Sequence, residues 1–195
     1  MALAFQFGIV VRGGRVKSHV VILLIFIIKV INQYRENIIQ LVYEFYISCL
    51  KINDVKRIAV IGSIITNKEK PHDVDLLLTI PDELDLNRLA KISRVLQGKS
   101  GQIGGGADVF VANLNNEYLG RICIWKVCKF GVRMRCDADN CGKREYLHDD
   151  LSVVRLSKEL IDSPPLILFP KIVRNVSIPL DVEEGLINKI ISSAI

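Results

Sequence analysis

The middle of the chain alternates short apolar runs with one helical pattern. Residues 57–62 (RIAVIG) and 73–80 (DVDLLLTI) are apolar, partly β-branched and bounded by glycine or proline, which is typical of strands. Residues 81–98 begin with acidic residues and continue with apolar residues at helical spacing, which predicts a helix that stops at Gly98. A glycine-rich connection leads into residues 107–114 (ADVFVANL), the third expected strand. This order predicts an α/β (α+β) fold, a mixed β-sheet flanked by helices.

Two apolar segments precede this unit. Between Ile38 and Cys49 the apolar positions fall at helical spacing, which predicts a helix that begins at Ile38 or earlier. The run from Val20 to Ile28 is continuously apolar and follows basic residues, as a membrane anchor would. Lys29 interrupts it after nine residues, whereas a transmembrane helix needs about 20. We therefore expect a buried element and no membrane span; an interfacial anchor or a signal peptide are the alternatives.

The pattern is weaker after Asn115. A segment of mixed character and a loop-like segment precede a last helix, expected at about Leu151 to Asp162, and a tail. We therefore divide the chain into three parts: an N-terminal arm with the apolar segment (1–33), a core (34–115) and a C-terminal extension packed on the core (116–195).

Composition adds modest constraints. The 195 residues are 50% hydrophobic and 24% charged, as expected for one globular domain with an extension. The formal net charge of +5 would attract phosphate-bearing partners such as nucleotides or RNA. Five unevenly spaced cysteines, with no secretory cleavage pattern, favour a reduced, cytoplasmic setting.

Two carboxylates begin the second expected strand. Alternate side chains of a strand share a face, so Asp73 and Asp75 point one way and Val74 the other. Two close carboxylates repel each other, and burial adds to the cost unless a cation lies between them. The pair is therefore typical of a Mg²⁺ site. Asp108 opens the third strand; if that strand pairs with the second, three acids converge and could hold two ions about 4 Å apart.

A glycine and a serine follow the first expected strand. Gly62 and Ser63 would expose backbone N–H groups and a hydroxyl, which can bind a phosphate. Together with the acids, this turn predicts a nucleoside triphosphate bound through its metal-complexed tail. Each feature alone has an ordinary explanation: a solvated strand edge for the acid pair, a turn and helix cap for the Gly-Ser pair, and a strand cap for Asp108.

The combination resembles the DNA polymerase beta-like nucleotidyltransferase superfamily, and in size its minimal members. The matching residues are Ile61-Gly62-Ser63, Asp73-Val74-Asp75 and Asp108. The resemblance covers about residues 38–115. It implies the nucleotidyltransferase fold and the transfer of a nucleoside monophosphate from an NTP to a hydroxyl, with release of pyrophosphate.

The resemblance also implies residue roles. Asp73 and Asp75 would bind both Mg²⁺ ions, Asp108 would complete the site of the ion that activates the acceptor hydroxyl, and Ser63 would contact the β- or γ-phosphate. Small members often carry an arginine soon after the Gly-Ser pair, where this chain has apolar residues and a threonine. The cation for the triphosphate must then come from Lys68 or Lys70 of the same loop, or from elsewhere in the chain.

The implied partners are an NTP and an unidentified acceptor. Many small members pair with a helical protein in toxin–antitoxin-like modules, and some modify that partner or tRNA, so we expect a helical protein or an RNA and allow for an oligomer. One alternative keeps the fold without catalysis, as a binding or antitoxin-like module. Another is a nucleic-acid-binding protein that acts through the basic residues of the extension: Arg121, Lys126, Lys129, Arg133, Arg135, Lys143 and Arg144.

A zinc site in the extension is less favoured. Its potential ligands are Cys128, Cys136, Cys141 and His148. Their intervals lack the paired spacing of compact zinc sites, so unligated thiols are expected.

Overall fold

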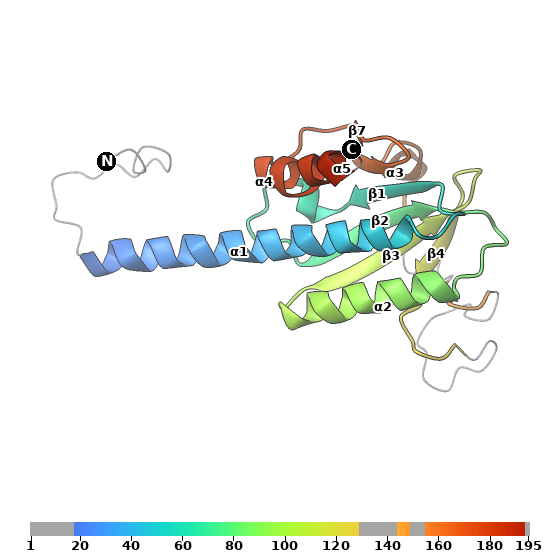
Figure 1. Cartoon of the computed structure of the whole chain (residues 1–195), viewed down its shortest axis with the longest axis horizontal. Helices are drawn as coiled ribbons and strands as arrows, with labels where there is room; N and C mark the ends of the chain where they lie inside the picture. Colours follow the sequence, from blue (N-terminus) through green and yellow to red (C-terminus); the bar gives the residue numbers. More distant parts are fainter. Residues whose placement is uncertain (1–17, 129–143, 149–154, 194–195) are drawn as a thin grey trace.

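The computed structural model is an α/β fold built on one seven-stranded mixed sheet with helices packed against it (Figure 1). It describes residues 18–128, 144–148 and 155–193. The strand order is β5-β4-β3-β2-β1-β6-β7; β2 and β3 are parallel, and the other neighbouring pairs are antiparallel. The mixed α/β architecture predicted from the sequence is therefore confirmed, and the finer assignment to the nucleotidyltransferase fold stays a prediction.

The three central strands lie where the sequence predicts them. They are β1 (Arg57–Ile61), β2 (Asp73–Thr79) and β3 (Gly106–Ala112). A parallel pair needs a crossover connection, and α2 (Asn87–Gln102) provides it between β2 and β3. In each strand the last four residues are buried, and all of them except Thr79 are apolar.

The predicted bounds of the crossover helix are wrong at both ends. The acidic residues precede α2, where Asp85 Oδ1 accepts a hydrogen bond of 2.9 Å from the Asn87 backbone N–H. The helix passes through Gly98 and continues to Gln102. A helical glycine costs about 1 kcal/mol, and burial of Leu96 and Ser100 on either side of Gly98 offsets this cost.

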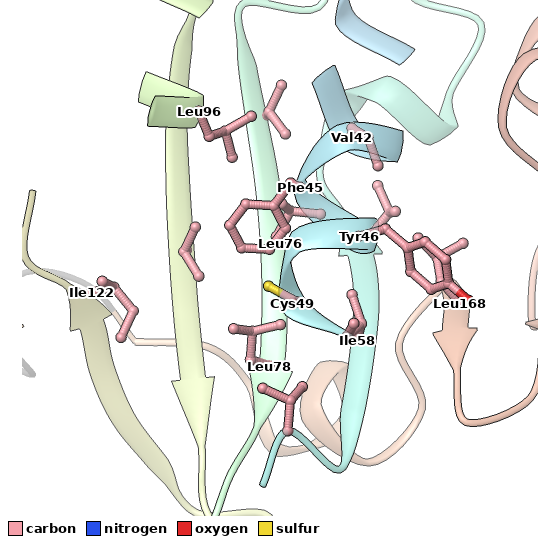
Figure 2. Packing of buried hydrophobic residues seen from close by; sticks show 14 of the residues in the cluster. Val42, Phe45, Tyr46, Cys49, Ile58, Leu76, Leu78, Leu96, Ile122 and Leu168 are labelled. Atoms are coloured by element: carbon pink, nitrogen blue, oxygen red, sulfur yellow. The ribbon is translucent and has the colours of Figure 1, made fainter. Parts of the chain in front are cut away.

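The long helix α1 (Ser18–Cys49) crosses the boundary drawn at residue 33. Its C-terminal half packs on the sheet through Ile38, Val42, Phe45 and Cys49, which are buried at helical spacing (Figure 2). Its N-terminal half extends beyond the sheet (Figure 1). This half contains the apolar run that was expected to be buried, and that burial stays a prediction. In the described part of the chain, no helix combines the length and the apolarity that a membrane crossing requires.

The C-terminal extension contributes to both edges of the sheet. Strands β4 (Tyr118–Ile122) and β5 (Leu147–His148) extend one edge, and β6 (Leu166–Phe169) and β7 (Val173–Arg174) extend the other. The remaining elements are a 3₁₀ turn η1 (Ser63–Ile65), α3 (Lys158–Asp162), α4 (Leu180–Val182), a π-helical turn η2 (Glu183–Ile187) and α5 (Asn188–Ser193).

This extension forms more secondary structure than its sequence pattern predicts. The last helix was predicted from about residue 151, but α3 begins at Lys158, where the Ser157 hydroxyl caps it by accepting a hydrogen bond of 3.2 Å from the Leu160 backbone N–H; residues 149–154 lie outside the described part. The tail was given no structure, yet its apolar run forms β6, which pairs with β1. A short strand of this kind is stabilised by its neighbour in the sheet, and that neighbour is distant in the sequence.

Candidate functional site

The three predicted acids lie on one face of the sheet. Strands β2 and β3 pair in register, with Asp75 opposite Asp108 and Asp73 opposite Gly106. Val74 and Leu76 point to the other face, into the large apolar core beneath α1 and α2. The prediction that the third strand lies beside the second, with Asp108 on the same face as the pair, is therefore correct.

Glycines make room for two of these carboxylates. A Cβ atom on Gly106 would lie 2.2 Å from Asp73 Oδ1, and a Cβ atom on Gly62 would lie 2.0 Å from Asp75 Oδ2. Gly62 also has φ of 79°, a backbone conformation that other residues rarely adopt. The Gly-Ser turn therefore lies directly against the Asp75 carboxylate. This contact is possible only because Gly62 has no side chain.

The environment of Asp75 disfavours its charged form. Burial, followed by the charges of Asp108 and Asp73, raises its pKa to about 6. An ordinary aspartate has a pKa of about 3.9, because water solvates its charged form. Near neutral pH the folded chain thus holds a carboxylate whose charge is poorly compensated, and a bound cation would lower this pKa again.

An arginine partly neutralises the third acid. Arg121 on β4 donates from Nη1 to Asp108 Oδ1 over 3.1 Å, and both side chains are partly exposed. Arg121 reaches this position because β4 pairs with β3, which places it opposite Phe110, two residues along from Asp108. From the sequence, Arg121 is only one of the basic residues of the extension, because the weak pattern of β4 does not predict its pairing.

In this conformation the three carboxylates are better suited to bind one hard cation than two. Asp73 and Asp75 offer carboxylate oxygens, which Mg²⁺ prefers. Burial and like charges raise the pKa of Asp75, so a positive charge beside it would be favourable. Asp108 is held by Arg121. No group of three or more His, Cys, Asp and Glu side chains converges as metal ligands within the described ranges.

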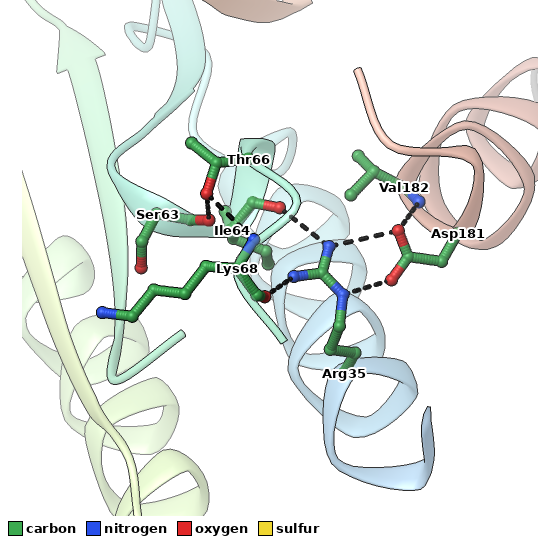
Figure 3. Close-up of polar contacts among 7 residues, drawn as sticks. All are labelled: Arg35, Ser63, Ile64, Thr66, Lys68, Asp181 and Val182. Carbon is green, nitrogen blue, oxygen red and sulfur yellow. Dashed lines mark hydrogen bonds and ion pairs between the residues drawn. The ribbon is translucent and has the colours of Figure 1, made fainter. Parts of the chain in front are cut away.

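The predicted phosphate-binding residues occupy the loop between β1 and β2. Ser63 begins η1, and its carbonyl accepts hydrogen bonds from the Thr66 backbone N–H (3.1 Å) and hydroxyl (2.7 Å). Lys68 is exposed, and its side chain extends away from Arg35 (Figure 3). The Lys70 ammonium lies 5.3 Å from the centre of the Tyr34 ring, a cation–π contact.

Two residues of α1 that the sequence analysis did not select also contact this loop. Tyr34 donates from its hydroxyl to the Pro71 carbonyl over 2.8 Å. Burial, and then the charge of Asp73, raise the pKa of the Tyr34 hydroxyl. Arg35 is buried and contacts the loop backbone. The only feature of the sequence that points to Tyr34 and Arg35 is their position, one turn before the predicted helix.

The basic and cysteine-containing segment lies largely outside the described residues. This holds for Lys129, Arg133, Arg135, Cys136, Cys141 and Lys143. Of the described members, Arg144 donates to the Leu84 carbonyl over 2.5 Å, and Cys128 Sγ accepts a hydrogen bond of 3.4 Å from the Tyr146 backbone N–H. The zinc alternative and the nucleic-acid alternative both stay predictions.

Comparison of the chain with protein-family models, with curated proteins and with solved structures finds no match.

Proposed function

We propose that this protein is a Mg²⁺-dependent nucleotidyltransferase, which transfers a nucleoside monophosphate from an NTP to an acceptor hydroxyl. One observation carries the proposal. Asp75 and Asp108 lie in register on neighbouring parallel strands, with Asp73 on the same face and the Gly62 backbone against Asp75. The arrangement is costly for the folded chain, because burial, followed by the charges of Asp108 and Asp73, raises the pKa of Asp75 to about 6. A bound cation would offset that penalty and could then attract an anionic ligand.

In the proposed reaction, the acceptor oxygen bonds to the α-phosphorus while the bond to the β-phosphate oxygen breaks, and pyrophosphate leaves. Asp73 and Asp75 would hold the metal, and Asp108 would join them after release from Arg121. The bound Mg²⁺ would align the acceptor hydroxyl and neutralise phosphate charge. The Gly62 and Ser63 backbone would bind the phosphate tail with Lys68 or Lys70, and Asp108 would take the proton of the acceptor hydroxyl.

A second candidate is a binding module that keeps the fold without catalysis. The Asp108–Arg121 ion pair favours it, since an internal cation already compensates the third acid. Such a module would bind a nucleotide, or a helical partner protein, without transferring anything.

Labelled transfer separates the two candidates. The chain is incubated with each α-labelled NTP, Mg²⁺ and either total RNA or the proteins that co-purify with it. Label transfer that Asp73→Ala and Asp75→Ala abolish, and that Asp54→Ala leaves intact, supports the enzyme; Asp54 is an exposed acid paired with Lys56, and serves as the matched control. Nucleotide binding without transfer by the unaltered chain would refute catalysis and support the module.

A further inference from the structure

The loop between β1 and β2 is exposed from Thr66 to Lys70, yet its backbone is fixed by α1. Arg35 donates from Nη1 to the Lys68 carbonyl over 2.5 Å and from Nη2 to the Ile64 carbonyl over 3.2 Å (Figure 3). Tyr34 holds the far end of the loop by donating to the Pro71 carbonyl. Consecutive residues of one helix thus hold three points of the loop that carries the proposed phosphate-binding groups.

Arg35 is itself fixed from the other side by the C-terminal helices. Its Nε and Nη2 donate to the two carboxylate oxygens of Asp181, in the first turn of α4 (Figure 3). The Asp181 carboxylate also accepts a hydrogen bond of 3.0 Å from the Val182 backbone N–H. Arg35 is only 8% exposed, so these contacts form largely away from solvent. A bidentate pair of this kind defines the orientation of the guanidinium plane as well as its position.

We propose that Arg35 is a positioning residue that, held by Asp181 and assisted by Tyr34, fixes the β1–β2 loop in the conformation that binds the triphosphate. This inference rests on the proposed function. Arg35 does not itself serve as the missing cation of the Gly-Ser motif, because Nε, Nη1 and Nη2 all donate within the protein. It acts by ordering the loop before the nucleotide arrives, which lowers the entropy lost on binding.

Arg35→Lys tests the guanidinium geometry. A lysine keeps the charge and can pair with Asp181, but one ammonium cannot also replace the planar fork that reaches two carbonyls. We expect deuterium uptake by the loop amides of the nucleotide-free chain to increase, and KM for the NTP to rise about tenfold, the loss expected for a charged hydrogen bond. The kcat should stay within about twofold, because the acids are untouched.

Two milder variants and one control accompany it. Asp181→Asn keeps the shape of the Arg35 partner and should move loop exchange and KM in the same direction, so the test does not depend on Arg35→Lys folding. Tyr34→Phe keeps the ring under Lys70 and removes only the bond to Pro71, so we expect a smaller rise in KM, about threefold. Arg174→Met is the control. It removes the ion pair between Arg174 and Glu183, which also belongs to the C-terminal helices, and it should change neither loop exchange nor KM.

The outcomes separate this inference from the proposed function. If the unaltered chain transfers label and Arg35→Lys changes neither KM nor loop exchange, the positioning role is overturned and the enzyme stands. If no variant, the unaltered chain included, binds or transfers a nucleotide, the proposed function and the nucleotide-positioning role both fail, whatever the loop exchange shows. A loss of kcat in Arg35→Lys with KM unchanged would also overturn the positioning role, since it would indicate that the substitution acts on the acids.

Discussion

The two faces of β2 differ in burial at its N-terminal end, whereas both faces are buried at its C-terminal end, where Leu77 lies in a second apolar cluster. On one face Val74, Leu76 and Leu78 have no solvent exposure and lie in the large apolar core. On the other face Asp73 is exposed, and Asp75 is half-buried beside carboxylates of like charge. Because alternate side chains of a strand point in opposite directions, neighbouring residues of one strand have separate environments.

Because of this difference, substitutions on the two faces should change the stability of the fold in opposite directions. The apolar face stabilises the fold through burial, about 25 cal/mol for each Å² removed from water. The acidic face lowers stability near neutral pH, since ionisation of Asp75 is less favourable in the folded chain than in the unfolded chain. A face that lowers stability while holding a defined geometry is typical of a functional site.

The largest effect is expected on the apolar face. Leu76→Ala removes a fully buried side chain beneath α1 (Figure 2) and should lower the free energy of unfolding by about 2–5 kcal/mol. Urea denaturation at constant pH measures it. Asp73→Ala, three residues earlier on the opposite face, should change stability by less than about 0.5 kcal/mol. Equal losses in the two variants would contradict the separation of the faces.

The second-largest effect is expected at Asp75, where a substitution should raise stability by an amount that depends on pH. The pKa of Asp75 is raised to about 6, so ionisation lowers stability progressively as pH rises from 4 to 6, and the loss is complete above 6. Asp75→Asn removes it and should stabilise the chain at pH 8 by about 1–2 kcal/mol, after allowance for solvent screening. At pH 4 the difference should fall to about 0.5 kcal/mol or less, because the folded chain holds the proton and the unfolded chain is about half protonated.

Thermal unfolding across this pH range measures the difference. Asp54→Asn removes the same charge from an exposed acid and should show no such trend. A stabilisation by Asp75→Asn that is as large at pH 4 as at pH 8 would exclude the electrostatic explanation.

The sequence predicted the central part of the fold because its signals are local. The strand that contains Asp75 is identified by its own apolar run, and the alternation along that run already places Asp73 and Asp75 on one face. The position of Asp108 required one further assumption, that its strand is the neighbour of β2, and the crossover helix between them supported it. These features do not depend on distant residues.

The sequence could not predict what the C-terminal extension contributes. Arg121 reaches Asp108 only because β4 pairs with β3 at an irregular register, and Arg35 meets Asp181 across 146 positions of sequence. Contacts of this kind leave no periodic pattern, since each partner alone is an ordinary surface-type residue. The same reasoning explains why β6 was assigned to a tail.

Binding of a divalent cation should offset the loss of stability that the acidic face causes near neutral pH. At about ten times its dissociation constant, Mg²⁺ bound only to the folded chain adds about 1.4 kcal/mol, which corresponds to a rise of about 3–5 °C in Tm for a chain of this size. Thermal unfolding at pH 7.5 with and without MgCl₂, reversed by EDTA, measures it. Asp75→Asn should lose this response, whereas Asp54→Asn should keep it. An equal response in Asp75→Asn would place the cation elsewhere.

The smallest effect concerns the arginine at the rim of the site. Arg121→Gln removes the cation paired with Asp108; because both side chains are partly exposed, stability should change by less than about 1 kcal/mol. The freed carboxylate should instead bind metal more readily, so the Mg²⁺ concentration that produces a given rise in Tm should fall about threefold, equivalent to about 0.65 kcal/mol. Arg94→Gln removes the same charge from a side chain that donates to the backbone carbonyls of Ile124 and Trp125, and should leave that concentration unchanged. Weaker Mg²⁺ binding in Arg121→Gln would mean that the ion pair organises the acidic face rather than competing with the metal. That result would favour the non-catalytic module, in which Arg121 permanently takes the place of the second ion.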